Sequence, residues 1–113
     1  MKIFPTEIVI VGSKVFYRFT RDFEIHDTII PKGFITDGAT VPKIFWPAFP
    51  PVESYFGAAA VHDYHLSIGV DWKTAEQIFK KNLESDGIGK IKRFLVVNAV
   101  RVGGVLRRKR KII

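Results

Sequence analysis

The pattern of residues from 1 to about 50 is typical of β-strands rather than helices. β-Branched and aromatic residues dominate two segments, residues 6–11 and 14–21. Gly12 and Ser13 between them are a two-residue hairpin signal. In the second segment successive side chains alternate between faces, so Val15, Tyr17 and Phe19 share one face. The pattern therefore predicts an antiparallel hairpin.

The next segment is less regular. Residues 23–30 fit either a further pair of strands or a continuation of the preceding strand. A turn is expected at residues 31–33, followed by a short extended piece at 34–36. Four prolines then make a helix unfavourable before residue 52, namely Pro42, Pro47, Pro50 and Pro51.

From residue 52 onward the spacing of apolar residues becomes helical. One helix is predicted over residues 52–66, ending at Gly69. A second begins after Asp71 as its N-cap, ends near Ser85 and stops at Gly87. A third covers residues 88–106 and is expected to end or weaken at Gly103 and Gly104.

Each predicted helix has a face expected to pack. The small residues 57–60 of the first helix favour close contact with a neighbour. The second helix has its apolar stripe at Trp72, Ala75, Phe79 and Leu83, and the third at Ile91, Leu95, Ala99 and Val102. The predicted fold class is α+β, with a small N-terminal antiparallel β-sheet followed by three packed α-helices. We expect a single domain over residues 1–106 and a basic C-terminal segment over residues 107–113.

Composition narrows the class of protein. The 113 residues are 47% hydrophobic and 26% charged, which excludes a disordered chain. The absence of cysteine excludes disulfides, zinc ribbons and thiol catalysis. No apolar stretch approaches the ~20 residues of a membrane helix, and no signal peptide is expected at the N-terminus.

The positive charge is concentrated at the C-terminus. Net charge is +7, and five positive residues lie within the last seven: Arg107, Arg108, Lys109, Arg110 and Lys111. Three interpretations remain open: contact with nucleic acid, contact with an anionic surface, and a solvated terminus that aids solubility. The absence of interleaved aromatic residues disfavours a stacking platform for single-stranded nucleic acid.

Four residues are candidates for catalysis. His62 and Asp63 lie late in the first predicted helix, and Glu76 lies on the apolar stripe of the second. Since a short connection makes these helices antiparallel neighbours, Glu76 is expected to contact His62 and orient it as a general base for water. Asp37, in the loop before the helices, is a third acidic candidate.

Two other interpretations of these residues stay open. A His–carboxylate pair between packed helices is often only a satisfied polar contact. His62, His65 and nearby carboxylates are also candidates for a calcium or zinc ion, although the two histidines are three apart rather than four. No other cofactor is expected. Asp71 is most simply explained as a helix cap.

Several blocks of sequence resemble a known family. They are residues 31–34 (PKGF), 36–42 (TDGATVP), 59–64 (AAVHDY) and 75–79 (AEQIF). Together they resemble a phage and prophage family catalogued as domain of unknown function 1353. The resemblance carries over Asp37, His62 and Asp63. The family usually has Asp at the position of Glu76, and Tyr at the position of Leu66.

Three functions follow as hypotheses. The resemblance implies a small phage-encoded protein. Together with the small size, the aromatic-rich body and the basic C-terminal segment, it supports a non-enzymatic virion (tail or baseplate) or host-interaction component, whose partners are other phage structural proteins or a host protein. It would be made in the host cytoplasm and be available for incorporation into the virion. The second hypothesis is a small hydrolase acting on host envelope lipid or polymer through His62. The third is a nucleic-acid-associated effector that uses the basic C-terminal segment.

Overall fold

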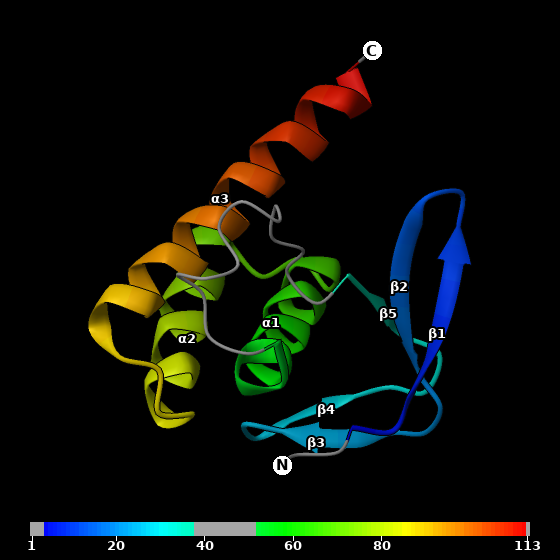
Figure 1. Cartoon of the computed structure of the whole chain (residues 1–113), viewed down its shortest axis with the longest axis horizontal. Coiled ribbons are helices and arrows are strands. Elements are labelled where there is room, and N and C mark those ends of the chain that lie inside the picture. The colour runs from blue at the N-terminus through cyan, green and yellow to red at the C-terminus, as the bar shows by residue number, and fades with distance from the viewer. Residues whose placement is uncertain (1–3, 38–51, 113) are drawn as a thin grey trace.

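The computed structural model describes residues 4–37 and 52–112, with side chains as far as residue 101 and, in the second segment, from residue 54. Five short strands precede three helices, so the predicted α+β class is confirmed (Figure 1). The predicted absence of helix from residues 38–51 lies outside the described residues. No described helix is both long and apolar enough to cross a membrane.

The first two strands form the predicted hairpin. β1 (Thr6–Val11) pairs antiparallel with β2 (Lys14–Phe19), with Val11 opposite Lys14 across the Gly12–Ser13 turn. Gly12 has φ +62°, a backbone conformation that glycine adopts without steric cost. β5 (Ile35–Thr36) pairs antiparallel with the other side of β2, which gives the strand order β1-β2-β5. β1 is therefore an edge strand of this sheet.

Residues 23–30 form a strand pair rather than a continuation of β2. β3 (Phe23–Ile25) and β4 (Thr28–Ile30) make a separate two-stranded sheet. Their two-residue turn has positive φ at both His26 (47°) and Asp27 (60°), as the right-handed twist of a tight hairpin requires. The turn contains no glycine. His26 Nε2 lies 3.0 Å from Asp86 Oδ1 at the end of α2, so a tertiary contact holds this hairpin against the helices.

The helix ends follow their local sequence signals. α1 (Val52–Ser67) and α2 (Trp72–Ser85) are each followed by a glycine in the left-handed region, at Gly69 and Gly87. At Gly87 the following amide, Ile88 N, donates to Leu83 O at 3.0 Å, which satisfies a carbonyl in the last turn. The predicted N-cap is also confirmed, because the Asp71 carboxylate accepts from the Thr74 amide at 3.3 Å.

α3 (Lys90–Ile112) corrects two predictions. It continues through Gly103 and Gly104 instead of ending there, so the basic C-terminal segment is the last part of this helix. Its buried face is also different from the predicted one. Ile91 is 78% exposed, whereas Val96 and Val97 are buried, a rotation of the packed face around the helix.

α1 lies between two core clusters and contributes to both. On one side Tyr55, Ala58 and Ala59 pack with side chains of α2 and α3, including Phe79, Leu83 and Val96. On the other side Phe56, Ala60 and Val61 pack against Phe19, Ile25 and Ile30 of the strands. The predicted close packing of the alanine-rich turn is confirmed, since Ala58, Ala59 and Ala60 are at most 2% exposed.

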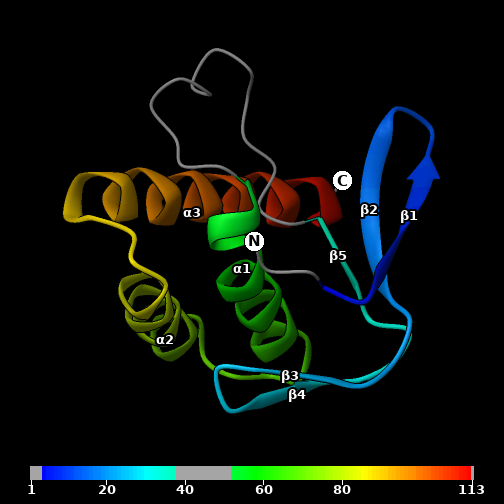
Figure 2. The ribbon, with the colours of Figure 1, turned by 60° about the horizontal axis from the view of Figure 1, so that its bottom comes forward.

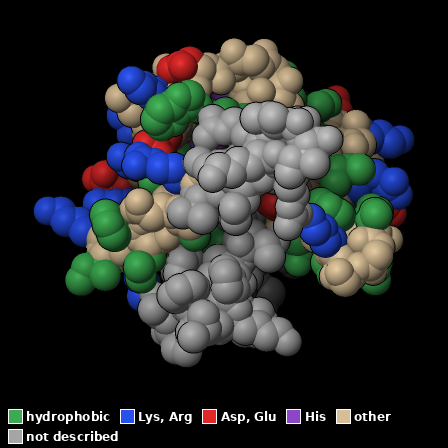
Figure 3. All heavy atoms as spheres, turned by 90° about the horizontal axis from the view of Figure 1, so that it is seen from above, with side chains coloured by type: hydrophobic (Ala, Val, Ile, Leu, Met, Phe, Trp, Pro, Cys, Tyr) green, Lys and Arg blue, Asp and Glu red, His purple; other side chains and the backbone are tan. Residues whose placement is uncertain are grey.

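The β1–β2 hairpin stands beside the helices, while β3–β4 runs past the end of α1 (Figure 2). Several large apolar side chains remain exposed, among them Ile8, Ile10 and Val11 of β1. Seen from above, hydrophobic side chains lie on both flanks of the molecule and Lys and Arg side chains project at its margins (Figure 3).

Candidate active site

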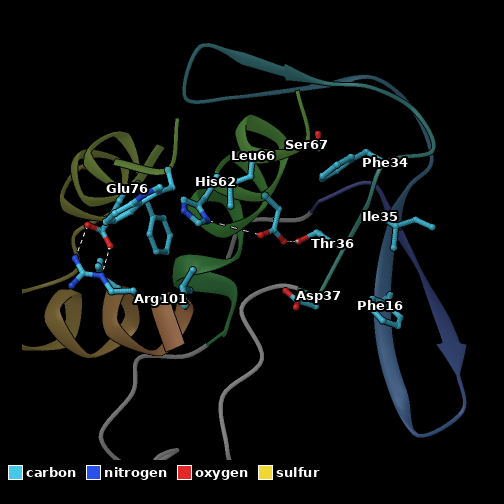
Figure 4. Close-up of a pocket in the computed structure, with 15 residues that line it drawn as sticks. Phe16, Phe34, Ile35, Thr36, Asp37, His62, Leu66, Ser67, Glu76 and Arg101 are labelled. Carbon is cyan, nitrogen blue, oxygen red and sulfur yellow. Dashed lines mark hydrogen bonds and ion pairs between the residues drawn. The ribbon is translucent and has the colours of Figure 1, made fainter. Parts of the chain in front are cut away.

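A pocket of about 560 Å³ lies between the sheet and the three helices. This volume is within the range of about 300–1,000 Å³ that small-molecule sites occupy. All four residues singled out from the sequence line it: Asp37, His62, Asp63 and Glu76. They come from the end of β5, from α1 and from α2, so the fold gathers segments that are distant in sequence (Figure 4).

His62 occupies the inner part of this pocket. Its side chain is 8% exposed, and its ring packs on Phe79 of α2 with centroids 4.9 Å apart and planes inclined by 34°. The imidazole Nδ1 lies 4.0 Å from Asp63 Oδ1. This distance is that of a charge interaction rather than a hydrogen bond. The aromatic contact restricts the orientation of the ring.

Asp63 connects His62 to the strand side of the pocket. The Thr36 hydroxyl of β5 donates to Asp63 Oδ2 at 2.5 Å, a short hydrogen bond to a carboxylate. The other carboxylate oxygen, Oδ1, is the one nearest His62. Asp37 follows Thr36 directly, so pairing of β5 with β2 also brings Asp37 to the pocket. Thr36 itself is buried, with 2% exposure.

The predicted contact between Glu76 and His62 is not the one that forms. Instead, Arg101 of α3 donates from Nε to Glu76 Oε1 at 2.9 Å and from Nη2 to Oε2 at 2.7 Å. Lys80 Nζ lies 3.9 Å from Oε2. The hydrogen bonds from Arg101 hold the pKa of Glu76 below its ordinary value against the opposing effect of burial. The charges of Arg101, Lys80 and His62 act in the same direction as those hydrogen bonds. Glu76 therefore lines the pocket as the partner of Arg101.

The described residues do not assemble a metal site. Among residues 4–37 and 52–112, no three His, Asp or Glu side chains lie together so as to hold a metal ion. His65, a candidate ligand in that interpretation, has its Nε2 3.5 Å from the Thr28 hydroxyl of β4. His65 is also not among the pocket residues.

Arg101 and the apolar walls of the pocket are the features that the sequence analysis missed. Arg101 is a single charged residue within the otherwise mostly apolar stretch from residue 94 to 106, and that isolation was an available signal. The walls combine strand and helix residues, which sequence spacing does not relate to one another. They are Phe16, Phe34, Ile35, Leu66, Trp72, Phe79, Val97 and Val100.

The basic residues assigned to anionic-surface or nucleic-acid binding follow the backbone of α3, but their side chains lie outside those described. They are Arg107, Arg108, Lys109, Arg110 and Lys111. Their binding role stays a prediction.

Comparison with known proteins assigns the chain to a family. The model of the family described as "Protein of unknown function (DUF1353)" matches residues 13–100. The chain belongs to this family. The matched DUF1353 region contains Asp37, His62, Asp63 and Glu76, and ends one residue before Arg101. No curated protein and no solved structure matches the chain significantly.

Proposed function

We propose that this DUF1353 protein is a small hydrolase in which His62 is the general base that activates water. The observation that carries the proposal is the convergence of Asp37, His62 and Asp63 on one pocket of ligand size. Asp37 directly follows β5, whereas His62 and Asp63 belong to the next described element, α1. Titratable groups gathered in a concave site of ligand size are a usual mark of catalytic chemistry.

The geometry supplies two requirements of a general base. The His62 ring is held in place by its contact with Phe79, which favours a fixed direction of proton transfer. The Asp63 carboxylate at 4.0 Å stabilises the imidazolium formed when His62 takes a proton from water. Asp63 is itself fixed by the hydrogen bond from Thr36. Glu76 makes no hydrogen bond to His62 in this step, since both its oxygens accept from Arg101, and it acts on the imidazolium through its charge alone.

The test is hydrolysis of chromogenic aryl esters, phosphodiesters and glycosides by the purified protein and by matched variants. His62→Gln should lower kcat/KM by about 10²- to 10⁴-fold, the usual contribution of a general base. Asp63→Asn should give a smaller loss. The wild-type rate should fall at acid pH, because a protonated imidazole cannot accept a proton.

His65→Gln is the matched control, because His65 lies three residues further along α1 and does not line the pocket. It should retain wild-type activity. Circular dichroism and thermal unfolding must show that each variant remains folded. Equal rates for His62→Gln and wild type on every hydrolysed substrate, or no hydrolysis of any class, would reject the proposal.

A second candidate is the virion or host-interaction role that the family resemblance implies. The observation in its favour is the edge strand β1, where Ile8 and Ile10 are 66% and 69% exposed. An apolar edge strand is a surface on which another protein can add a strand. If the protein is a phage component, Ile10→Lys should lower its recovery in assembled virions, whereas Ile91→Lys on α3 should not. Unchanged recovery of both variants would argue against this role.

A further inference from the structure

The pocket lining combines polar and apolar side chains, and this combination indicates the class of substrate. The polar ones are Thr36, Asp37, His62, Asp63, Ser67, Glu76 and Arg101. One wall is made by Phe16 and Ile35 of the sheet, and the facing wall by side chains of the helices. Mostly apolar walls with few convergent polar groups are typical of sites that bind the hydrocarbon part of a ligand.

The charges of the pocket disfavour an anionic substrate. Its described lining contains three carboxylates, those of Asp37, Asp63 and Glu76, and one guanidinium, that of Arg101. Arg101 is already paired with Glu76 through two hydrogen bonds. Among the described lining residues, carboxylates thus outnumber guanidinium groups, a balance that favours an uncharged ligand over a phosphate or a polyanionic polymer.

The pocket also has exposed apolar side chains where α1 leads into α2. Leu66 is 39% exposed and Trp72 is 46% exposed, and both line the pocket. A hydrocarbon chain entering here would cover their surface and remove it from water, which favours binding by about 0.8 kcal/mol for each buried CH₂ group. Ile68 lies between them in sequence, is 58% exposed and does not line the pocket.

We propose that the substrate is an uncharged ester of a fatty acid, whose acyl chain lies between the apolar walls while its carbonyl reaches His62. This inference rests on the proposed hydrolase function. His62 takes one proton from water as the water oxygen bonds to the carbonyl carbon. The bond between that carbon and the alcohol oxygen then breaks, and the imidazolium returns the proton to the departing alkoxide. The products are one fatty acid and one alcohol.

The first test is a series of 4-nitrophenyl esters from acetate through butyrate and hexanoate to octanoate. For the wild type, kcat/KM should rise with each added CH₂ group by up to about fourfold, the factor that corresponds to its burial. Leu66→Asn should flatten this dependence, and Ile68→Asn should leave it unchanged. Both positions are partly exposed, so both variants are expected to fold.

The outcomes separate this inference from the proposed function. If His62 is needed for acetate hydrolysis but kcat/KM does not depend on acyl length, the hydrolase stands and the fatty-acyl substrate is rejected. An equal length dependence in Leu66→Asn and wild type also rejects it. If no ester is hydrolysed, calorimetric titration with 1-decanol, an uncharged ten-carbon alcohol, tests the pocket alone. Binding that Leu66→Asn removes and Ile68→Asn retains supports the apolar site, and absence of binding overturns it.

The same ester chemistry occurs in soluble molecules and in lipids. Comparing the octanoate ester free in solution with a diacylglycerol in neutral phosphatidylcholine vesicles separates these sources. Turnover in either arm supports the proposal, and the arm with the higher rate identifies the source. Absence of turnover in both arms rejects the ester substrate, and absence of 1-decanol binding also rejects the apolar site.

Discussion

Arg101 of α3 donates two hydrogen bonds to the carboxylate of Glu76 on α2, at 2.9 and 2.7 Å. This two-point contact joins the helices at the rim of the pocket and fixes both side chains in one geometry. It also explains why Glu76, although it lies near the apolar face of α2, remains ionised, since its pKa is held below the ordinary value. The contact therefore links helix packing to the charge of the pocket.

The lowered pKa of Glu76 predicts a pH-dependent contribution to stability. Because its pKa is lower in the folded than in the unfolded state, the contribution is fully present above the unfolded-state value. It is lost as pH falls through the folded-state value. Glu76→Gln should therefore be less stable than wild type near neutral pH, and the difference should shrink in acid. Urea unfolding across this range measures it.

The matched control for this prediction is Glu84→Gln, at an exposed position of the same helix. Its difference from wild type should be small at every pH. A constant difference between wild type and Glu76→Gln from neutral to acid pH would contradict the role assigned to the Arg101 contact.

The packed face of α3 is tested by two truncations. Val96 is fully buried, so Val96→Ala should lower the free energy of unfolding by about 2 kcal/mol through lost burial and a residual cavity. Ile91→Ala removes more atoms, but Ile91 is 78% exposed, so the change should stay within about 0.5 kcal/mol. Chemical denaturation of both variants provides the comparison. If Ile91→Ala lowered the free energy of unfolding more than Val96→Ala, the face of α3 that carries Ile91 would be the packed one.

Asp71 is expected to act as a helix cap. Its carboxylate accepts a hydrogen bond from the Thr74 amide in the first turn of α2. Asp71→Ala should therefore cost about 1 kcal/mol of stability, while Asp71→Asn should retain most of it. Hydrolytic activity of the folded protein, where present, should be unchanged in both, because Asp71 does not line the pocket. A large loss of activity without loss of stability would show that Asp71 acts in the reaction rather than as a helix cap.

Gly57 in the middle of α1 lies close to side chains of the strand side of the core. A Cβ atom there would lie 3.1 Å from Phe4 Cζ and 3.3 Å from Ile25 Cγ2. Glycine to alanine in a helix interior normally gains up to about 1 kcal/mol, but this contact should cancel the gain or reverse it for Gly57→Ala. Thermal or urea unfolding measures the effect.

The smaller side chain of Phe4→Leu should relieve the contact, so Gly57→Ala should be less costly in that background. The difference between the two backgrounds is a coupling energy between the positions. A full gain from Gly57→Ala in both backgrounds would show that α1 has room for the extra methyl group.

Local sequence determined the turns and helix ends of this protein. Gly12, Asp71 and Gly87 act within a few residues of themselves, through backbone conformation or a capping hydrogen bond. Such short-range effects can be predicted without knowing the rest of the fold. The alternation that places Tyr17 and Phe19 on one face of β2 is equally local, and both residues belong to the core.

The tertiary structure alone decided which face of α3 packs and which partner Glu76 binds. Residues 94–97 of α3 are all apolar, so periodicity alone does not distinguish Leu95 from Val96 as the buried residue. The rotation of the helix is set by the shape of the surface on α1 and α2 that it covers. That rotation brings Arg101 to Glu76, 25 residues away in sequence, and so displaces the contact with His62 that adjacency of the first two helices suggested.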